Sequence, residues 1–296
     1  MKAAHGVPVK AQEDIEPTED DLDEKAYAAL LAIFENFIKG IGEQITLDEL
    51  IEELAVLRAR FGIDAALKGF EIDFETAVAL LNSDVAKLTD EQKKRRDVLL
   101  AAFDNIIDFA VAEEYQMIEE MDDMNGEMGW GMDLEEGELD GIMDVFEKYN
   151  LNYAAIEDGD IEHAMHIALM MYLIEDGTVL TYRTQLDDRV RPWHLALEGI
   201  SAPKAIFPEW LIPPIEHGCR CFLEEENMQG KIGDVKDVVY EVPQMPSWFN
   251  RTFKESVAKG GRIFSDEHRY FDVKDDDVEK LQGMAERIKK GYWDGD

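Results

Sequence analysis

Helical periodicity dominates the first 120 residues of this chain and restricts what they can fold into. Apolar residues recur there at steps of three and four in four segments. Two of the segments begin with a capping box, Thr46 with Glu49 and Thr89 with Gln92, in which each residue's side chain bonds the other's backbone N–H. The predicted helices cover residues 24–41, 46–62, 72–84 and 89–121. The first part of the chain is therefore predicted to be an all-helical bundle or stalk.

The pattern changes after Gly141. One more amphipathic helix is predicted over 160–177, and the alternating β-branched residues of 178–185 indicate a strand after it. Further predicted elements are strands at 220–226 and 237–243 and a C-terminal helix at 276–292. The expected fold class is therefore α+β, with an N-terminal helical bundle or stalk followed by a small α+β domain whose loop is stapled by Cys and His.

Two acidic runs guide the division of the chain into parts. Glu13 to Glu24 holds eight acidic residues and no basic one, which is typical of a solvated, flexible lead-in. Glu113 to Asp140 also lacks Lys and Arg and interrupts the chain. The expected parts are an acidic flexible lead-in at 1–24, a helical region at 25–140, a core domain at 141–222 and a C-terminal α+β extension at 223–296.

The overall excess of acidic residues limits the partners of this protein. Among its 296 residues, 30 Lys and Arg stand against 66 Asp and Glu, a formal net charge of -36. Such a surface repels nucleic acid, so sequence-specific nucleic-acid binding is not expected. No apolar run approaches the roughly 18 to 20 residues that span a bilayer, and we expect a soluble protein that is not exported by a standard signal. Solubility and a partner with a basic surface both explain the excess.

Residues 136–147, EGELDGIMDVFE, fit part of an EF-hand calcium loop. Acidic residues stand at the first, third, fifth and twelfth positions of that register, and a glycine stands at the sixth. The first position is Glu136, however, and a glutamate is too long for a tight loop that takes aspartate there. A solvated acidic turn is the favoured interpretation.

Both cysteines of the chain lie in PPIEHGCRC, residues 213–221. A disulfide between Cys219 and Cys221 would close a very small ring and add little stability. A catalytic thiol would need a base such as His217 and an orienting Asn or Asp, and such partners normally lie far apart in sequence. Two small buried thiols that bind no metal are a further interpretation, because Cys-x-Cys is less specific than paired Cys-x-x-Cys motifs.

A metal site would use both thiols together. Zinc takes four tetrahedral ligands from Cys and His, and His217, Cys219 and Cys221 alternate so that an extended segment or tight turn can point them to one side. His194, which lies 23 residues before His217, is the expected fourth ligand. Other histidines that compete for this place are His163, His166 and His268. Such a site would staple the Pro-rich loop to the strand that follows it.

A cluster of opposite charges precedes His194. Asp187, Asp188, Arg189 and Arg191 are candidates for acid–base or anion-binding groups. Opposite charges this close in sequence more often pair with each other and fix a loop, so a structural role is the default. The sequence contains no Gly-rich phosphate loop, no G-x-S-x-G elbow and no H-E-x-x-H helix.

Two segments, YRTQLDDRVRPWHLALEGI at 182–200 and PEWLIPPIEHGCRC at 208–221, together resemble the core motif of the phage Mu F-like minor head (head morphogenesis) proteins. That family shows an aromatic-Arg-Thr strand, then D-x-R-V-R-x-x-H, a spaced Leu and Gly, and a Pro-Pro loop ending in C-R-C. The matching residues are Tyr182, Arg183, Thr184, Asp187 or Asp188, Arg189, Val190, Arg191, His194, Leu197, Gly199, Pro213, Pro214, Cys219, Arg220 and Cys221. GGRIFSDEHRYFDV, at 260–273, is similar to a segment that follows the core motif in some members.

The resemblance implies a structural component of the virion or procapsid. Such a protein is present in few copies at the portal vertex, contacts portal or major capsid protein, and is assembled in the host cytoplasm for head morphogenesis or DNA delivery. No established catalytic activity is implied. The resemblance strengthens the zinc interpretation, because His194, Cys219 and Cys221 are among the matched residues. The chain departs from many members at His217, which stands where they have Asn or another polar residue close before the first Cys.

An enzyme built on the same core domain is the alternative. Related domains can carry a transferase or toxin-like activity, and Arg183, Asp188 and His194 would then form its site. Convergence of these side chains on an open cleft favours catalysis, whereas a closed metal site favours structure.

Overall fold

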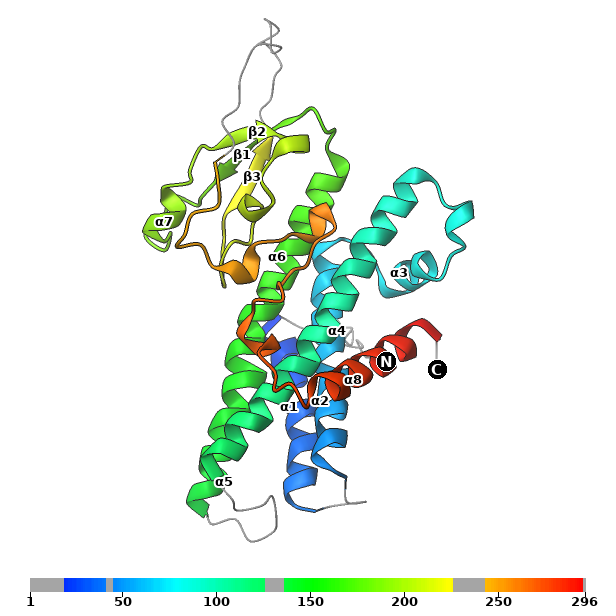
Figure 1. Cartoon of the computed structure of the whole chain (residues 1–296), viewed down its shortest axis with the longest axis vertical. Coiled ribbons are helices and arrows are strands. Elements are labelled where there is room, and N and C mark those ends of the chain that lie inside the picture. Colours follow the sequence, from blue (N-terminus) through cyan, green and yellow to red (C-terminus); the bar gives the residue numbers. More distant parts are fainter. Residues whose placement is uncertain (1–18, 41–44, 126–135, 226–242, 295–296) are drawn as a thin grey trace, which may run out of the picture.

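The computed structural model describes residues 19–40, 45–125, 136–225 and 243–294, which form a helical bundle with a small sheet at one end (Figure 1). The α+β class expected from the sequence is confirmed. The longer helices are α1 (Glu19–Ile38), α2 (Leu47–Gly69), α3 (Phe74–Leu81), α4 (Asp90–Asn125), α5 (Glu136–Glu147), α6 (Ala154–Leu173) and α8 (Val278–Asp294). A π-helical segment, Lys148–Tyr153, joins α5 to α6.

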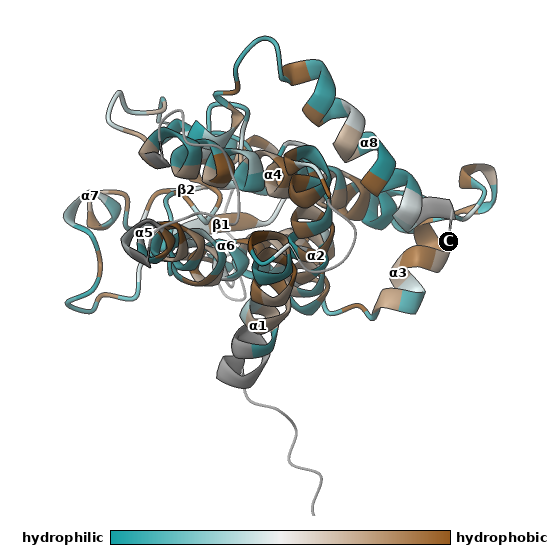
Figure 2. Ribbon diagram, turned by 90° about the horizontal axis from the view of Figure 1, so that it is seen from below, coloured by the Kyte–Doolittle hydropathy of each residue, from teal (hydrophilic) through white to brown (hydrophobic). Residues whose placement is uncertain are grey.

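Helix α2 packs against both α4 and α6. Its start is the predicted capping box, in which the Thr46 hydroxyl accepts from the Glu49 N–H at 3.2 Å and the Glu49 carboxylate accepts from the Thr46 N–H at 2.7 Å. The apolar faces of the bundle helices turn toward one another (Figure 2). At the C-terminal end of α2, a Cβ on Gly69 would lie 2.1 Å from the Glu162 carbonyl oxygen, so only glycine permits this close approach to α6.

A buried charge cluster also ties α2 to α4 and α6. The Arg58 guanidinium bonds Glu113 Oε2 at 3.0 Å and Asp158 Oδ1 at 2.7 Å, and Glu157 Oε2 lies 3.6 Å from its Nη2. Burial opposes the charge of Arg58, but the three carboxylates hold its pKa well above the usual value. Burial raises the pKa of Glu113 and of Glu157. One guanidinium therefore neutralises carboxylates from two helices inside the bundle.

The second acidic run of the sequence is only partly a surface feature. Glu113 and Glu114 are buried in α4, and neither carboxyl oxygen of Glu114 has a hydrogen-bond partner. Glu120 pairs with Lys148 at 2.6 Å. Basic residues from other parts of the chain, Arg58 and Lys148 among them, thus compensate a run that contains none of its own.

Three expected elements differ in the structure or lie outside it. Helix α1 begins at Glu19, inside the expected flexible lead-in, whose residues 1–18 lie outside the described residues. Residues 136–147 form α5, so the expected acidic turn is wrong; the calcium loop is wrong too, because side chains of a continuous helix radiate around its axis and do not converge on one ion. The strand expected at 237–243 falls almost wholly on 226–242, outside the described residues.

The sheet has three antiparallel strands, with β1 between β2 and β3. They are β1 (Val179–Arg183), β2 (Ser201–Pro203) and β3 (Phe222–Glu225). Helix α6 leads into β1, and the short helix α7 (Pro192–Leu195) lies in the connection from β1 to β2 (Figure 1). One hydrophobic core runs from the bundle into the sheet, so the expected boundary at residue 140 does not separate two cores.

The C-terminal segment returns along α4. The Asn105 side chain accepts from the N–H groups of Ile263 and Phe264, at 2.8 and 2.9 Å, and donates to the Phe264 carbonyl at 3.0 Å. The Phe109 ring stacks on Phe264 with centroids 4.2 Å apart. Residues 243–294 contain 3₁₀ turns and α8 but no strand, so within the described part of the expected extension at 223–296 the only strand residues are the last three of β3.

Replacing Arg58 with Ala would leave its buried carboxylates without a counter-charge. We predict that the free energy of unfolding at neutral pH falls by about 3 to 5 kcal/mol, the usual cost of removing one partner of a buried ion pair. Urea unfolding followed by circular dichroism measures this change. Arg60→Ala, on the exposed side of the same helix, is the matched control and should lie within about 0.5 kcal/mol of the parent. Equal effects of the two substitutions would contradict the role given to the cluster.

Candidate metal centre

Three of the expected metal ligands come together in the structure. His194 lies on α7, while Cys219 and Cys221 directly precede β3, and the pairing of β1 with β3 brings the two segments side by side. His194 Nδ1 lies 3.3 Å from the Cys221 sulfur and 3.8 Å from the Cys219 sulfur. All three ligand atoms lie within 4.8 Å of one another, so this His/Cys cluster (His194, Cys219 and Cys221) can hold a metal ion.

The two thiols are free and buried. The Cys219 thiol donates to the Cys221 sulfur; this bond and burial raise the pKa of Cys219, while the same bond lowers the pKa of Cys221. The hydroxyl of Tyr182 is buried near these thiols, and burial raises its pKa. A pair of sulfurs in which a hydrogen bond lowers the pKa of one thiol is suited to bind a soft or borderline cation.

The imidazole of His194 is oriented by a carboxylate on its far side. His194 Nε2 lies 3.0 Å from Glu216 Oε2, and the indole N–H of Trp193 donates to the same oxygen at 2.9 Å. Arg191 Nε lies 3.3 Å from this oxygen as well. Because the carboxylate accepts the Nε2 proton, the lone pair of Nδ1 faces the two sulfurs. A carboxylate behind a ligating histidine is a common outer partner of protein metal sites.

Helix α6 fixes the segment that carries the cysteines. The Asp160 carboxylate, which is buried, accepts from the Gly218 N–H at 2.8 Å and pairs with His217 Nδ1 at 3.1 Å. One turn further along α6, His163 Nε2 donates to the Cys221 carbonyl at 2.7 Å. The backbone on both sides of Cys219 is thus tied to the bundle.

His217 does not join the cluster. Gly218 has a φ of +64°, so the chain turns between His217 and Cys219, and the alternation expected for an extended segment is broken. The His217 ring points instead toward Asp160 and lies against the ring of Phe253, with centroids 4.9 Å apart. The prediction that His217 is a metal ligand is therefore wrong for this arrangement, because its ring pairs with Asp160. The competing donors are also placed elsewhere: His163 bonds a backbone carbonyl, His166 is exposed on α6, and His268 lies beside His217.

The charged residues of the motif form ion pairs between segments of the sheet region. Arg183 bonds Glu224 at 2.6 Å and Glu198 at 3.1 Å, and so joins β1 to β3 and to the turn before β2. Arg220 makes two hydrogen bonds to Asp187, at 2.7 and 2.8 Å. Asp187 thus fixes its loop through a partner 33 residues away, and not through the neighbouring Arg189 or Arg191 that the sequence suggested.

The remaining charged motif residues do not form a site of their own. Arg191 donates to the His217 carbonyl at 2.7 Å, so it braces the segment before the cysteines. Asp188 and Arg189 are exposed, and the Arg189 N–H donates to the Asp187 carboxylate. Of this group, only Arg191 approaches the His/Cys cluster, through its contact with Glu216.

Sequence reasoning missed two residues of the centre, Asp160 and Glu216. Glu216 stands inside the segment 213–221, and a carboxylate close to a candidate ligand could have been considered as its orienting partner. Asp160 lies 57 residues before His217, and only the packing of α6 against the segment shows its role.

The His/Cys cluster is closed to solvent. His194, Cys219 and Cys221 expose 3%, 5% and 3% of their surface. A buried set of nitrogen and sulfur donors is typical of a structural metal site, whereas a catalytic metal keeps a position open to water or substrate. The geometry therefore favours an ion that crosslinks α7 to the segment before β3.

Comparisons of this chain with protein-family models, with curated proteins and with solved structures find no match. Among the helices of the described ranges, none is both long and apolar enough to cross a bilayer.

Metal analysis of the purified protein tests the cluster. We predict about one metal ion per chain, lost in His194→Ala and in Cys219→Ser because each removes a ligand. His217→Ala should keep the ion, since its ring pairs with Asp160 and not with the cluster. His166→Ala, on the exposed side of α6, is the matched control. Unchanged metal content in the His194 and Cys219 variants, or loss of the ion in His217→Ala, would contradict this assignment.

Proposed function

We propose that this protein is a structural minor head component of a tailed phage or prophage, acting in head morphogenesis or DNA delivery. The observation that carries the proposal is that the residues resembling the phage Mu F-like motif hold one another in a single unit. Arg183 and Arg220 pair with acidic residues that flank the strands, and His194, Cys219 and Cys221 meet in the buried cluster. The motif residues thus have a structural role: they stabilise the module formed by the three-stranded sheet, α7 and the segment that carries the cysteines.

We further propose that the ion is zinc. Two thiolates and an imidazole are the ligand types that zinc takes in structural sites, and Glu216 supplies the outer carboxylate that orients such an imidazole. The described residues provide three ligands. The buried hydroxyl of Tyr182, which lies near Cys221, is our candidate for the group beside the fourth coordination position. The ion would crosslink α7 to the segment before β3.

The charge of the chain supports a protein partner over the packaged genome. A chain with a net charge of -36 is repelled by DNA, whereas a basic face on the portal or the shell attracts it. Glu113 pairs with Arg58 and Glu120 pairs with Lys148, which reduces the exposed negative charge of the second acidic run. The contact with the basic partner is therefore not assigned to that run alone. The proposed location is the portal vertex of the virion head, reached after assembly in the host cytoplasm.

The alternative, a transferase or toxin-like enzyme on the same core, has less support from the geometry. Its expected site residues do not converge on a cleft: Arg183 is held by Glu198 and Glu224, Asp188 is exposed on the surface, and His194 is buried in the cluster. A closed centre with paired charges around it favours the structural role.

Co-purification tests the proposed function. The chain should be co-expressed with the portal and major capsid proteins of the genome that encodes it, and complexes isolated through a tag on the chain. We expect portal or capsid protein to be retained at about 0.1 M salt and released toward about 1 M, because the Debye length shrinks from about 10 Å to about 3 Å. Retention that does not change with salt would contradict a charge-driven contact.

A loss-of-function experiment tests whether the His/Cys cluster is needed for head assembly. Heads assembled with Cys219→Ser in place of the parent chain should contain less of this protein or fail to mature, whereas His166→Ala should behave as the parent does. Normal, infectious particles formed without the chain, together with no retained portal or capsid protein, would overturn the proposed function.

A further inference from the structure

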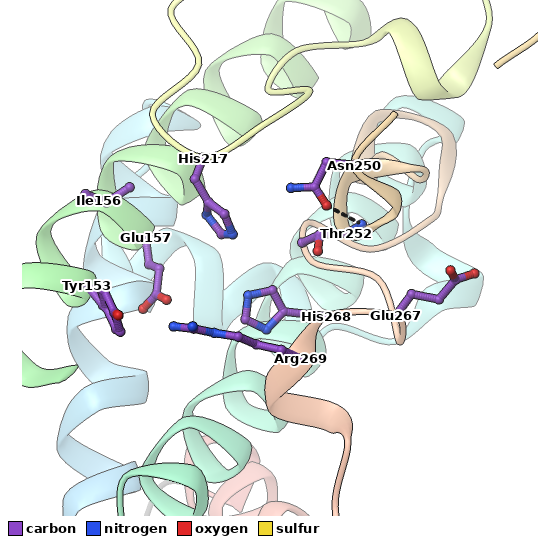
Figure 3. A pocket seen from close by; sticks show the side chains of 9 residues that line it. All are labelled: Tyr153, Ile156, Glu157, His217, Asn250, Thr252, Glu267, His268 and Arg269. Carbon is purple, nitrogen blue, oxygen red and sulfur yellow. Dashed lines mark hydrogen bonds between the residues drawn. The ribbon is translucent and has the colours of Figure 1, made fainter. Parts of the chain in front are cut away.

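A pocket of about 470 Å³ lies beside the segment that carries the cysteines, and the metal centre does not account for it. Three parts of the chain that are distant in sequence form its walls (Figure 3). Tyr153, Ile156 and Glu157 come from the start of α6 and the π-helical segment before it, His217 comes from the segment before Cys219, and Asn250, Thr252, Glu267, His268 and Arg269 come from the C-terminal segment. This volume is within the usual range for small-molecule sites.

Arg269 brings a permanent positive charge into this pocket. Its side chain extends across the space between the walls (Figure 3), and its guanidinium lies 4.9 Å from the ring centroid of Tyr153 and 5.1 Å from that of Tyr270. Within the described ranges no carboxylate lies within 4 Å of this guanidinium, whereas Arg58, Arg183 and Arg251 each have one. Nη2 of this guanidinium donates to the Tyr270 hydroxyl at 3.5 Å, and its remaining N–H groups are left for an anion.

Two further donors face the same space. His268 Nδ1 accepts the Tyr270 N–H at 3.2 Å, which places the proton of the neutral ring on Nε2. Burial, with the nearby charges of His217 and Arg269, lowers the pKa of His268 to about 3, so the ring stays neutral. Asn250 uses its side-chain oxygen to accept from the Thr252 N–H at 3.2 Å, and its amide N–H₂ is left for a ligand (Figure 3).

The two carboxylates of the pocket are already engaged. Glu157 Oε2 lies 3.6 Å from the Arg58 guanidinium inside the bundle, so its charge is already paired with that of Arg58. Glu267 at the rim pairs with Arg251 and Lys254 and points away from the centre of the pocket (Figure 3). The polar groups left for a ligand are therefore mainly donors.

We propose that this pocket binds a small molecule that carries an oxyanion, a phosphate or a carboxylate, with Arg269, His268 and Asn250 as donors to it. An apolar or aromatic body would rest against Tyr153 and Ile156, of which Ile156 is 46% exposed. The inference is independent of the proposed head function, because it depends on the pocket alone. The bundle and the C-terminal segment each supply part of the site, so a bound ligand would also hold these parts together.

Titration calorimetry on the full, metal-loaded chain tests the site. Phenyl phosphate and benzoate are the two probes, and benzamide is the neutral control of similar size. We expect at least one of the anions to bind and benzamide to bind at least about tenfold more weakly, because it lacks the charge that Arg269 recognises. Tighter binding of phenyl phosphate assigns the site to phosphate ligands, and tighter binding of benzoate assigns it to carboxylates.

Substitutions localise the binding. Arg269→Gln removes the charge of the guanidinium, keeps a polar side chain, and should weaken binding of the better anion at least about tenfold. Ile156→Trp leaves Arg269, His268 and Asn250 in place and should abolish binding, because the larger side chain fills the pocket from an exposed position that folding tolerates. Arg189→Gln removes an exposed charge from the loop after β1 and should bind as the parent does. Failure of the parent to bind either anion, or parent-like binding by Ile156→Trp, would overturn the proposal.

Discussion

The hydrogen bonds from α6 to the segment that carries the cysteines decide where the candidate metal centre lies. Asp160 holds the Gly218 N–H and the His217 ring, and His163 holds the Cys221 carbonyl. Asp160 and His163 stand three residues apart on α6 and therefore share one face of the helix. The opposite side of α6 packs on α2 at Gly69. One helix thus connects the rigid bundle to the metal ligands, and the sheet is positioned through it.

Local signals predicted the local structure well. The capping box at Thr46 begins α2 as expected, and the β-branched residues before Arg183 form the central strand. Signals that depend on partners elsewhere in the chain failed. Residues 136–147 form a helix because Ile142, Val145 and Phe146 pack into the bundle. These three stand at helical spacing, but the acidic residues and glycines around them favoured a turn.

The same distinction explains what was found and missed in the site. The sequence correctly grouped His194 with Cys219 and Cys221. His194 follows β1 and the cysteines precede β3, so the pairing of these two strands brings the three residues together. Spacing alone also included His217, and the positive φ of Gly218 overturns it. His217 instead forms a wall of the pocket at Arg269, a group that comes from the end of the chain. Sequence distance hides such a site, because only the return of the C-terminal segment along α4 builds it.

We propose that His194, Cys219 and Cys221 together hold a zinc ion. X-ray absorption at the zinc edge of the purified protein measures the ligand atoms directly. We expect two sulfur atoms at about 2.3 Å and nitrogen at about 2.0 to 2.1 Å from the metal. A first shell that contains only oxygen and nitrogen would contradict it, because the two cysteines would then not be ligands.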